Sequence, residues 1–329
     1  MSTMTFPVTY STLACDALAH QVLTQYPIDC VTDCQLWNRG LSDIYLVQTR
    51  TTPYILRVTH AHWRTQAEVV FELELLDFLK DHQIPVAYPL TTWDGGLAIP
   101  LDAPEGQRYA ALFTYAPGTI ALGDLNETQS YALGETVAQM HRVAAQFRCG
   151  CDRAPLTPEY LLDRSLEEIV PFLHHRPDDL ACLHHTVAQI KQQVQHLPQQ
   201  DPYWVMCWGD PHSGNVHFTE DNQITLFDFD QCGYGWRAFE FGKFLQTSIR
   251  TGMRRSTRDA FLKGYQAIQP VFEEELNALQ AFTQMAHIWS WWICLNNTKL
   301  HNYSQLDDRF FSLRLQQLKM LKTHDWQLF

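Results

Sequence analysis

The chain has 329 residues, with 36 acidic and 24 basic side chains and a formal net charge of −12 with histidine neutral. This acidic balance argues against a protein that binds nucleic-acid phosphates or an anionic membrane surface. A hydrophobic content of 46% and an aromatic content of 12% exclude a disordered chain, and the length suffices for two domains. The charge is consistent with a cationic substrate and equally with simple solubility.

The nine cysteines do not form the even framework of a short secreted chain. Cys149-Gly150-Cys151 and the pair Cys30 and Cys34 each lack a second, properly spaced pair, so we expect reduced thiols and no zinc site. The N-terminus shows no basic region followed by an apolar run, and the uncharged stretch 276–298 is too polar to span a bilayer. We therefore expect a cytoplasmic protein with no membrane or nucleic-acid partner. The oligomeric state is not indicated.

The first part of the chain has the pattern of a small antiparallel sheet with one main helix. We predict a short helix over 10–25, followed by strands near 31–37, 43–49 and 53–59, because residues 44–49 alternate with a period of two. An amphipathic helix follows over 63–82, with Val69, Leu73, Leu76 and Leu79 on one stripe. Strands near 97–101 and 107–115 complete the sheet.

After Gly118 the pattern becomes mainly helical. We predict helices over 128–148, 158–173, 179–197, 237–250, 257–268 and most of 272–321, with one β insertion at 216–228. His141 lies on the apolar stripe of the 128–148 helix, so we expect a core histidine there. Proline and glycine become frequent around 100–118, which places the boundary between an N-lobe (1–117) and a C-lobe (118–329). The predicted fold class is α+β.

The segment 208–230 has the most informative spacing in the chain. Asn215 follows Asp210 by five residues across a loop that contains proline and glycine, and a short hairpin leads from there to Asp228. With Asp221-Asn222 as a two-residue turn, residue 216 lies opposite 227 and 215 opposite 228. Asn215 and Asp228 then meet at the open end, and their hard oxygen atoms suit Mg²⁺. The Asp-to-Asn spacing is that of a kinase catalytic loop.

These motifs resemble those of the aminoglycoside phosphotransferase/choline kinase family, a branch of the protein-kinase-like fold. The family's His-Gly-Asp-x-His-x-Gly-Asn loop corresponds to residues 208–215, and its Ile-Asp-Phe-Asp motif corresponds to residues 227–230. Residues 133–141 and 235–240 also resemble family helices, so the resemblance covers roughly residues 30 to 300. It implies a two-lobed fold with a sheet-rich, nucleotide-covering N-lobe and a larger helical C-lobe that holds the acceptor.

The resemblance implies a role for several residues of the C-lobe. Asp210 would be the catalytic base or the carboxylate that orients the acceptor, and Asn215 and Asp228 would bind Mg²⁺. Asp230 would assist the metal or the acceptor, and His212 would shape the loop or contact phosphate. Two positions depart from the family pattern, since Trp208 replaces the usual His and Glu240 replaces the usual Asp. We interpret both as altered support for the loop.

The nucleotide side is expected in the N-lobe. The turn that contains Gly40, Leu41 and Ser42 lies where the family covers the phosphates. Arg57 stands where kinases usually carry a phosphate-binding Lys, and its guanidinium keeps the charge. An inward carboxylate on the following helix must pair with a cation, and we favour Glu72 over Glu68. The stretch 113–118, including Thr114 and Tyr115, resembles the hinge whose backbone binds adenine.

These features predict an ATP- and Mg²⁺-dependent phosphotransferase. The expected acceptor is a hydroxyl of a small molecule of the amino alcohol, aminoglycoside or sugar type, possibly cationic. A protein Ser/Thr kinase of the same fold and a nucleotide-binding pseudokinase are the alternatives. The identity of the acceptor and the choice between ATP and GTP are not encoded in any motif we can identify.

Overall fold

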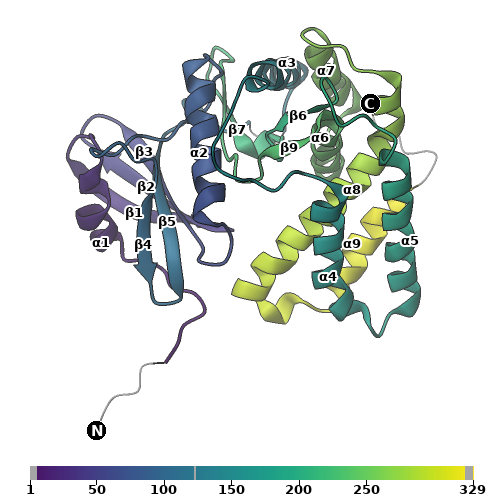
Figure 1. The fold of residues 1–329 in the computed structure, drawn as a ribbon, viewed down its shortest axis with the longest axis horizontal. Helices are drawn as coiled ribbons and strands as arrows, with labels where there is room; N and C mark the ends of the chain where they lie inside the picture. The colour runs from purple at the N-terminus through teal and green to yellow at the C-terminus, as the bar shows by residue number, and fades with distance from the viewer. Residues whose placement is uncertain (1–5, 122–123, 323–328) are drawn as a thin grey trace. The chain divides into compact units, whose positions relative to one another are not determined.

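The computed structural model describes residues 6–121, 124–322 and 329 (Figure 1), so the N-terminal stretch expected to lack a signal peptide lies partly outside the described residues. The chain forms two compact units. The first comprises residues 1–117 and 148–153, and the second comprises residues 118–147 and 154–329. Within the described ranges, no helix is both long and apolar enough to cross a membrane.

The first unit is a five-stranded antiparallel sheet with helices on both faces (Figure 1). The strands run in the order β1-β2-β3-β5-β4. In chain order the elements are α1 (Cys15–Gln21), a 3-10 turn (Leu23–Gln25), β1 (Val31–Arg39), β2 (Ser42–Thr49), β3 (Pro53–Thr59), α2 (Gln66–Asp81), β4 (Ile99–Ala103) and β5 (Gly106–Thr114). The antiparallel sheet and the single main helix confirm the predicted architecture of this part.

Alternation along β3 gives each face of the sheet its partner. Leu56 and Val58 are fully buried in a cluster with Leu18 and Val22, from α1 and the residue after it. Successive strand residues point to opposite faces, so Arg57 lies on the face that α2 covers. The predicted apolar stripe of α2 is buried as expected. Arg57 therefore leaves the sheet toward a helix, not toward solvent.

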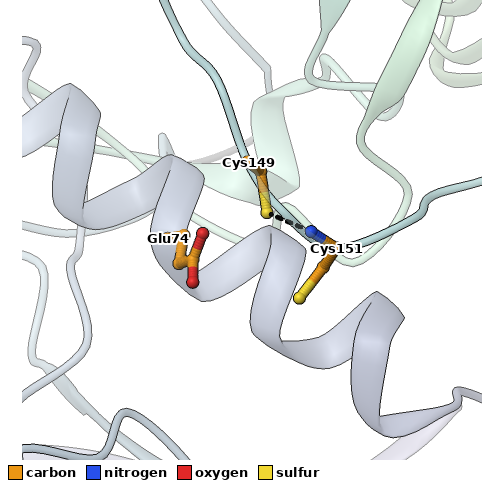
Figure 2. Close-up of side chains that lie close together, drawn as sticks. All are labelled: Glu74, Cys149 and Cys151. Carbon is orange, nitrogen blue, oxygen red and sulfur yellow. Dashed lines mark hydrogen bonds between the residues drawn. The ribbon is translucent and has the colours of Figure 1, made fainter.

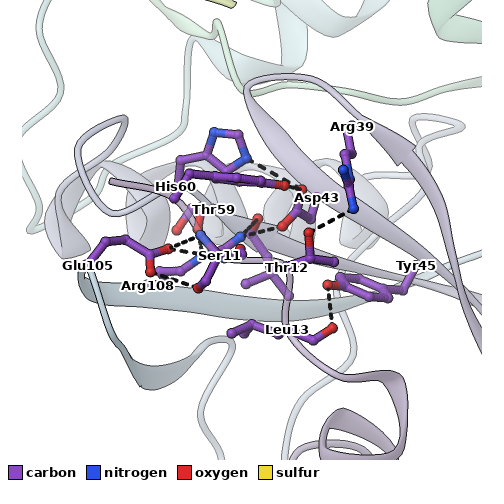
Figure 3. Close-up of polar contacts among 12 residues, drawn as sticks. Ser11, Thr12, Leu13, Arg39, Asp43, Tyr45, Thr59, His60, Glu105 and Arg108 are labelled. Atoms are coloured by element: carbon purple, nitrogen blue, oxygen red, sulfur yellow. Dashed lines mark hydrogen bonds and ion pairs between the residues drawn. The ribbon is translucent and has the colours of Figure 1, made fainter. Parts of the chain in front are cut away.

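A buried polar network holds the start of β2 in place (Figure 3). Arg108 of β5 donates to Asp43 at 2.7 Å, and both side chains are fully buried. Tyr10 also donates to Asp43, and Arg108 donates to the backbone oxygen of Ser11. Burial alone would raise the pKa of Asp43, but hydrogen bonds from His60, Tyr10 and Arg108 lower it to about 2. The network ties residues 10–11 and the β1–β2 turn to the sheet.

The second unit is mainly helical, with two small β-ribbons. In chain order its elements are α3 (Glu127–Ala144), a π turn (Glu159–Asp163), α4 (Arg164–Ile169), a 3-10 turn (Val170–Leu173), α5 (Pro177–Val194), β6 (Trp204–Cys207), a 3-10 turn (Ser213–Asn215), β7 (Val216–Phe218), β8 (Ile224–Leu226), β9 (Gly233–Trp236), α6 (Arg237–Thr251), α7 (Arg255–Gln266), α8 (Glu273–His301), a 3-10 turn (Tyr303–Gln305) and α9 (Asp308–Met320). Together with the first unit, this helical part confirms the α+β class.

Three features of this unit differ from the sequence prediction. The segment 158–173 is broken into π, α and 3-10 turns, and Pro171 at the start of its 3-10 turn has no N–H to continue the helix. The stretch 272–321 divides into two helices around residues 302–307. The ribbon β6–β9 was not predicted, because its strands are four residues long and Gly233 and Gly235 carry no side chains that could show an alternation.

Helices α3 and α7 approach closely at a glycine. A Cβ on Gly134 would lie 1.9 Å from the backbone oxygen of Phe261, so any side chain there would force the helices apart. His141, two turns further along α3, is 1% exposed, and its Nδ1 lies 2.8 Å from the Tyr265 hydroxyl of α7. This confirms the expected core histidine.

Candidate active site

The loop that carries Asp210 begins where β6 ends, beside its partner strand β9. Gly209 has φ +90°, and a Cβ there would lie 2.1 Å from the backbone oxygen of Gln231. Only glycine fits this position. The Gly209 N–H donates to Glu240 Oε1 at 2.8 Å, so a hydrogen bond links the start of the loop to the first turn of α6. The sequence interpretation of Glu240 as support for the loop agrees with this contact.

Trp208 replaces the family's His with a different kind of support. Its side chain is fully buried and stacks on Phe229, with ring centroids 5.4 Å apart. Its indole N–H lies 3.2 Å from the backbone oxygen of Phe227 and 3.0 Å from that of Asp228. One donor is therefore shared between two carbonyls of the segment that carries the proposed metal ligand. The substitution keeps a polar link between the two motifs.

Asp210 contacts three side chains, and the sequence did not predict that they surround it together. Its Oδ1 lies 3.1 Å from Lys243 Nζ, and its Oδ2 accepts a hydrogen bond from Gln231 Nε2 at 2.8 Å. His212 Nε2 lies 3.5 Å from the same Oδ2. The Asp210 side chain remains 13% exposed, whereas that of Lys243 is 5% exposed. The carboxylate is thus held on several sides and still reaches solvent.

These contacts keep Asp210 ionised. Burial alone would raise its pKa, but the charge of Lys243, together with hydrogen bonds from His212 and Lys243, holds the pKa well below its usual range. A base with such a low pKa is weak, because proton transfer works best when the pKa lies near the operating pH. The arrangement suits a carboxylate that accepts a hydrogen bond and orients its donor.

Lys243 and Gln231 are themselves fixed by α8. Lys243 Nζ donates to Ser290 Oγ at 2.7 Å, and Gln231 Oε1 accepts from Trp289 Nε1 at 2.8 Å. Neither Lys243 nor Gln231 was predicted as a site residue. The available signal was a lysine inside the apolar run 241–245, because a lysine that is buried needs a carboxylate partner.

Asn215 closes the loop onto Asp210. The Asn215 side-chain Nδ2 donates to the backbone oxygen of Asp210 at 3.1 Å, and the residue is 7% exposed. His212 shapes the same loop, since its Nδ1 accepts from the Gly214 N–H at 2.9 Å. With the amide nitrogen engaged in this way, the Asn215 amide oxygen is the atom suited to a cation.

The hairpin that joins Asn215 to Asp228 has a different register from the predicted one. Val216 pairs with Leu226 and Phe218 with Ile224, so the prediction of 216 opposite 227 and 215 opposite 228 was wrong by one residue. The cause is a three-residue loop, with Thr219 bonded to Gln223 and a left-handed φ of 58° at Asn222. Asn215 consequently bonds to Phe227 through the backbone, at 3.1 Å.

Asp228 follows directly after this last pair and has features of a ligand position. Its side chain is exposed and its φ is +58°, a conformation that costs energy outside glycine and is often found at functional sites. Asp230, two residues on, is 7% exposed. The amide oxygen of Asn215 and the carboxylate of Asp228 form a hard donor set, so these residues fit the expected Mg²⁺.

Behind the loop lies a buried cluster of three titratable groups whose pKa values are shifted by burial. Burial raises the pKa of Glu240 to about 8, and the Asp210 charge adds to this. Burial, with the Arg237 charge, lowers the pKa of His141 to about 3, and burial raises that of Cys207. The donor atoms of Glu240, His141 and Cys207 lie within 4.8 Å of one another. The acid that supports the loop therefore has a raised pKa.

In the first unit, Arg57 and Glu72 form a bidentate ion pair. The two nitrogen-to-oxygen distances are 2.7 and 2.6 Å, and the side chains are 8% and 1% exposed. Arg57 also lies over the ring of Phe113, 4.9 Å from its centroid. Of the two carboxylates left open by the sequence, Glu72 is the partner, while Glu68 forms a capping box with Thr65 at the start of α2.

The other residues that the sequence predicts on the nucleotide side lie at two ends of the same sheet. Arg39 pairs with Asp43, so Gly40, Leu41 and Ser42 form the connection between β1 and β2. Thr114 is the last residue of β5, and its N–H donates to the backbone oxygen of Tyr88 at 3.0 Å. Tyr115 follows it with 36% of its surface exposed.

Residues 33–278 match the family model described as the phosphotransferase enzyme family. An uncharacterized protein of Synechocystis sp. is 54% identical over 324 residues, covering 98% of this chain and 90% of its own. The amicoumacin kinase of Bacillus subtilis is 28% identical over 196 residues, covering 59% of this chain and 56% of its own.

Solved structures show the same fold. An amicoumacin kinase in complex with AMP-PNP, Ca²⁺ and Ami superposes with a TM-score of 0.76 at 19% identity, covering 91% of this chain and 90% of its own. A microcompartment-associated aminopropanol kinase gives 0.75 at 19% identity, covering 93% and 95%. The chain belongs to the phosphotransferase enzyme family: it is an enzyme of the small-molecule kinase class with a protein-kinase-like fold.

Proposed function

We propose that the protein transfers the γ-phosphoryl group of ATP, with Mg²⁺, to an alcohol hydroxyl of a small molecule. The acceptor classes that we propose are amino alcohols, aminoglycosides and sugars. The relatives named as kinases of amicoumacin and aminopropanol support a small organic acceptor. The observation that carries the proposal is the environment of Asp210, an ionised and partly exposed carboxylate held by Lys243 and Gln231.

Asp210 orients the acceptor hydroxyl by accepting its hydrogen bond. The O–H then lies along a fixed direction, and its oxygen lone pair is directed at the phosphorus atom, which is how positioning lowers the barrier of phosphoryl transfer. Lys243 and Gln231 fix the carboxylate and are positioning residues. The pKa of Asp210 is held far below neutrality, so Asp210 is too weak a base to remove the hydroxyl proton at the start of the reaction. The hydroxyl proton leaves late, because the new O–P bond makes the oxygen less basic as it forms.

Asn215 and Asp228 hold the metal, with Asp230 in support. Bound Mg²⁺ supplies positive charge that neutralises the phosphate oxygens. The residues themselves contribute a pre-formed donor set, because Trp208 fixes the backbone at Asp228 and Asp210 fixes the side chain of Asn215.

The first unit supplies the nucleotide contacts in this proposal. Arg57, held in orientation by Glu72, pairs with phosphate oxygens, the turn 40–42 covers the phosphates, and Thr114 with Tyr115 contacts the adenine through backbone groups. Residues 1–117 thus serve as the nucleotide-covering lobe and residues 118–329 as the lobe of catalysis, metal and acceptor. A guanidinium suits two oxygens of one phosphate better than an ammonium does.

A labelled-ATP assay against a panel of hydroxyl-bearing amines, amino acids, aminoglycosides and sugars tests the proposal. We expect label on at least one small molecule, dependence on a divalent cation, and loss of transfer in Asp228→Ala. Label found on protein in place of metabolites would favour a protein Ser/Thr kinase. Binding of Mg·ATP without turnover on any acceptor would contradict the proposal and favour a pseudokinase.

A further inference from the structure

Three side chains with metal-binding atoms come together in the first unit. A carboxylate oxygen of Glu74, on α2, and the sulfur atoms of Cys149 and Cys151 all lie within 4.8 Å of one another (Figure 2). All three side chains are partly exposed, so an ion in solvent can reach them. The cysteines belong to segment 148–153, which packs with the first unit although its chain neighbours on both sides belong to the second.

We propose that Glu74, Cys149 and Cys151 bind one Zn²⁺ ion, with a water molecule as the fourth ligand. The sequence alone argued against zinc because the Cys-Gly-Cys motif had no second ligand pair, and the fold now brings a third ligand from α2. Zn–S bonds of about 2.3 Å and Zn–O bonds of about 2.0–2.2 Å place tetrahedral ligands about 3.5–3.8 Å apart. Side-chain rotations that move the ligand atoms by about 1 Å would bring the three observed atoms to these tetrahedral spacings. The inference is independent of the proposed function.

The ligand types favour zinc over the other common ions. Two sulfur ligands are too soft for Mg²⁺ or Ca²⁺, and a carboxylate oxygen is too hard for a Cu(I) site. The backbone N–H of Cys151 donates to Cys149 Sγ at 3.2 Å (Figure 2). A hydrogen bond of this kind stabilises a thiolate and orients it, as outer-shell donors do in metal sites.

Zinc binding at this site would release protons. A cysteine thiol ordinarily keeps its proton at neutral pH when no ion is bound. Each S–H bond breaks as its sulfur binds the ion, and the proton passes to solvent. The affinity should therefore increase with pH.

The site would attach segment 148–153 to α2. Without an ion, Arg153 Nη1 links the segment to α2 by donating to the backbone oxygen of Glu68 at 3.1 Å. A bound ion would be coordinated by both cysteines of the segment and by Glu74, and would so link the segment to α2. We therefore expect the amides of residues 148–153 to exchange with solvent more slowly when zinc is bound.

The test uses the reduced full-length chain and Co²⁺ as a spectroscopic probe, followed by displacement with Zn²⁺. We expect one equivalent of Co²⁺ to give visible ligand-field bands of a tetrahedral site and a thiolate-to-cobalt charge-transfer band, both of which Zn²⁺ abolishes. Cys149→Ser and Cys151→Ser should each weaken binding at least tenfold, and Glu74→Gln should weaken it while keeping the charge-transfer band. Cys182→Ser, which changes a partly exposed thiol of α5, is the matched control and should bind normally.

Two results would overturn the proposal. One is the absence of a cobalt spectrum from a wild-type chain whose thiols a reagent shows to be reduced and accessible. The other is an unchanged spectrum and affinity in the double variant Cys149→Ser/Cys151→Ser. Circular dichroism of each variant checks the fold, and hydrogen exchange of residues 148–153 with and without Zn²⁺ gives a second readout on the unmodified wild type.

Discussion

Replacing Lys243 by Met tests how Asp210 is held. Lys243 Nζ lies 3.1 Å from Asp210 Oδ1, and its side chain is 5% exposed. Methionine keeps most of the aliphatic volume inside α6 and removes the charge. The carboxylate then loses its nearest cation, while the hydrogen bond from Gln231 and the contact with His212 remain.

The size of the effect follows from the distance. Two unit charges 3.1 Å apart interact by about 5 kcal/mol at an effective dielectric constant of about 20. Water that enters the space and the remaining partners of Asp210 reduce this, and we take about 2 kcal/mol, or about 1.5 pKa units. The pKa of Asp210 is depressed in the wild type and should rise by this amount in the variant.

The assay is kcat at pH 8, measured at saturating nucleotide and acceptor. In the wild type, the Asp210 pKa lies well below its usual range, so the carboxylate should be fully ionised at this pH. It should stay ionised in Lys243→Met, because a rise of about 1.5 units leaves the pKa no higher than its ordinary value. We expect kcat to fall by about 10- to 100-fold because the carboxylate is less well placed.

Lys243→Arg is the matched control, because it keeps the positive charge and should keep kcat near the wild-type value. An unchanged kcat in the methionine variant would show that Lys243 does not position Asp210. An equal fall in kcat in Lys243→Arg and Lys243→Met would show that Lys243 acts through the packing of α6 and not through its charge.

Three further outcomes follow from contacts described above. Glu72→Gln removes the carboxylate of the buried, bidentate pair with Arg57, so urea unfolding should show a loss of about 3 kcal/mol. The KM for ATP should also rise at least tenfold, unlike in the capping control Glu68→Gln. Trp208→Phe removes the N–H shared by two carbonyls, so the free energy of unfolding should fall by about 1–2 kcal/mol. The Mg²⁺ concentration needed for half-maximal rate should rise, and an unchanged concentration would contradict the role given to Trp208. The pKa of Asp43 falls from 3.8 to about 2 on folding, which stabilises the folded state by about 2 kcal/mol above pH 4. The difference in unfolding free energy between wild type and Asp43→Asn should therefore shrink as the pH is lowered from 4 toward 2. A difference that stays constant over this range would show that the Asp43 pKa is not lowered by folding.

The ion pair in the first unit was predictable from two periodicities. Alternation along β3 sets Arg57 on the face opposite Leu56 and Val58, and the helical repeat sets Glu72 on the buried stripe of α2. Both patterns are local, and burial of a carboxylate demands a cation. The sequence prediction itself took Arg57 from its resemblance to the kinase lysine position and Glu72 from the buried stripe and the charge argument.

The hairpin register shows where local reasoning failed. The residues Asp221-Asn222 suggested a two-residue turn, but the chain places only Asn222 in the left-handed region and uses a three-residue loop. Asparagine is compatible with either loop. The choice between these two loop lengths shifts every residue pair of the hairpin by one position. The residues of the two short strands do not alternate clearly between polar and apolar, so their pattern does not fix the register.

The environment of Asp210 depended on contacts that no local pattern contains. Lys243 comes from α6 and Gln231 from the segment after Asp230, while Ser290 and Trp289 of α8 hold both. These partners are separated by 21 to 58 residues in the contacts described. They meet because α6 and α8 pack against each other, which is a property of tertiary structure.

In the proposed mechanism, Asp210 orients the acceptor and does not bind the nucleotide. The decisive measurement is single-turnover transfer by wild type and Asp210→Asn, with the Kd for Mg·ATP measured in parallel. We expect the transfer rate of Asp210→Asn to fall by at least about 10²-fold, with a nucleotide Kd within about threefold of wild type. A wild-type rate in Asp210→Asn, or a loss of transfer explained entirely by lost nucleotide binding, would rule out this role for Asp210.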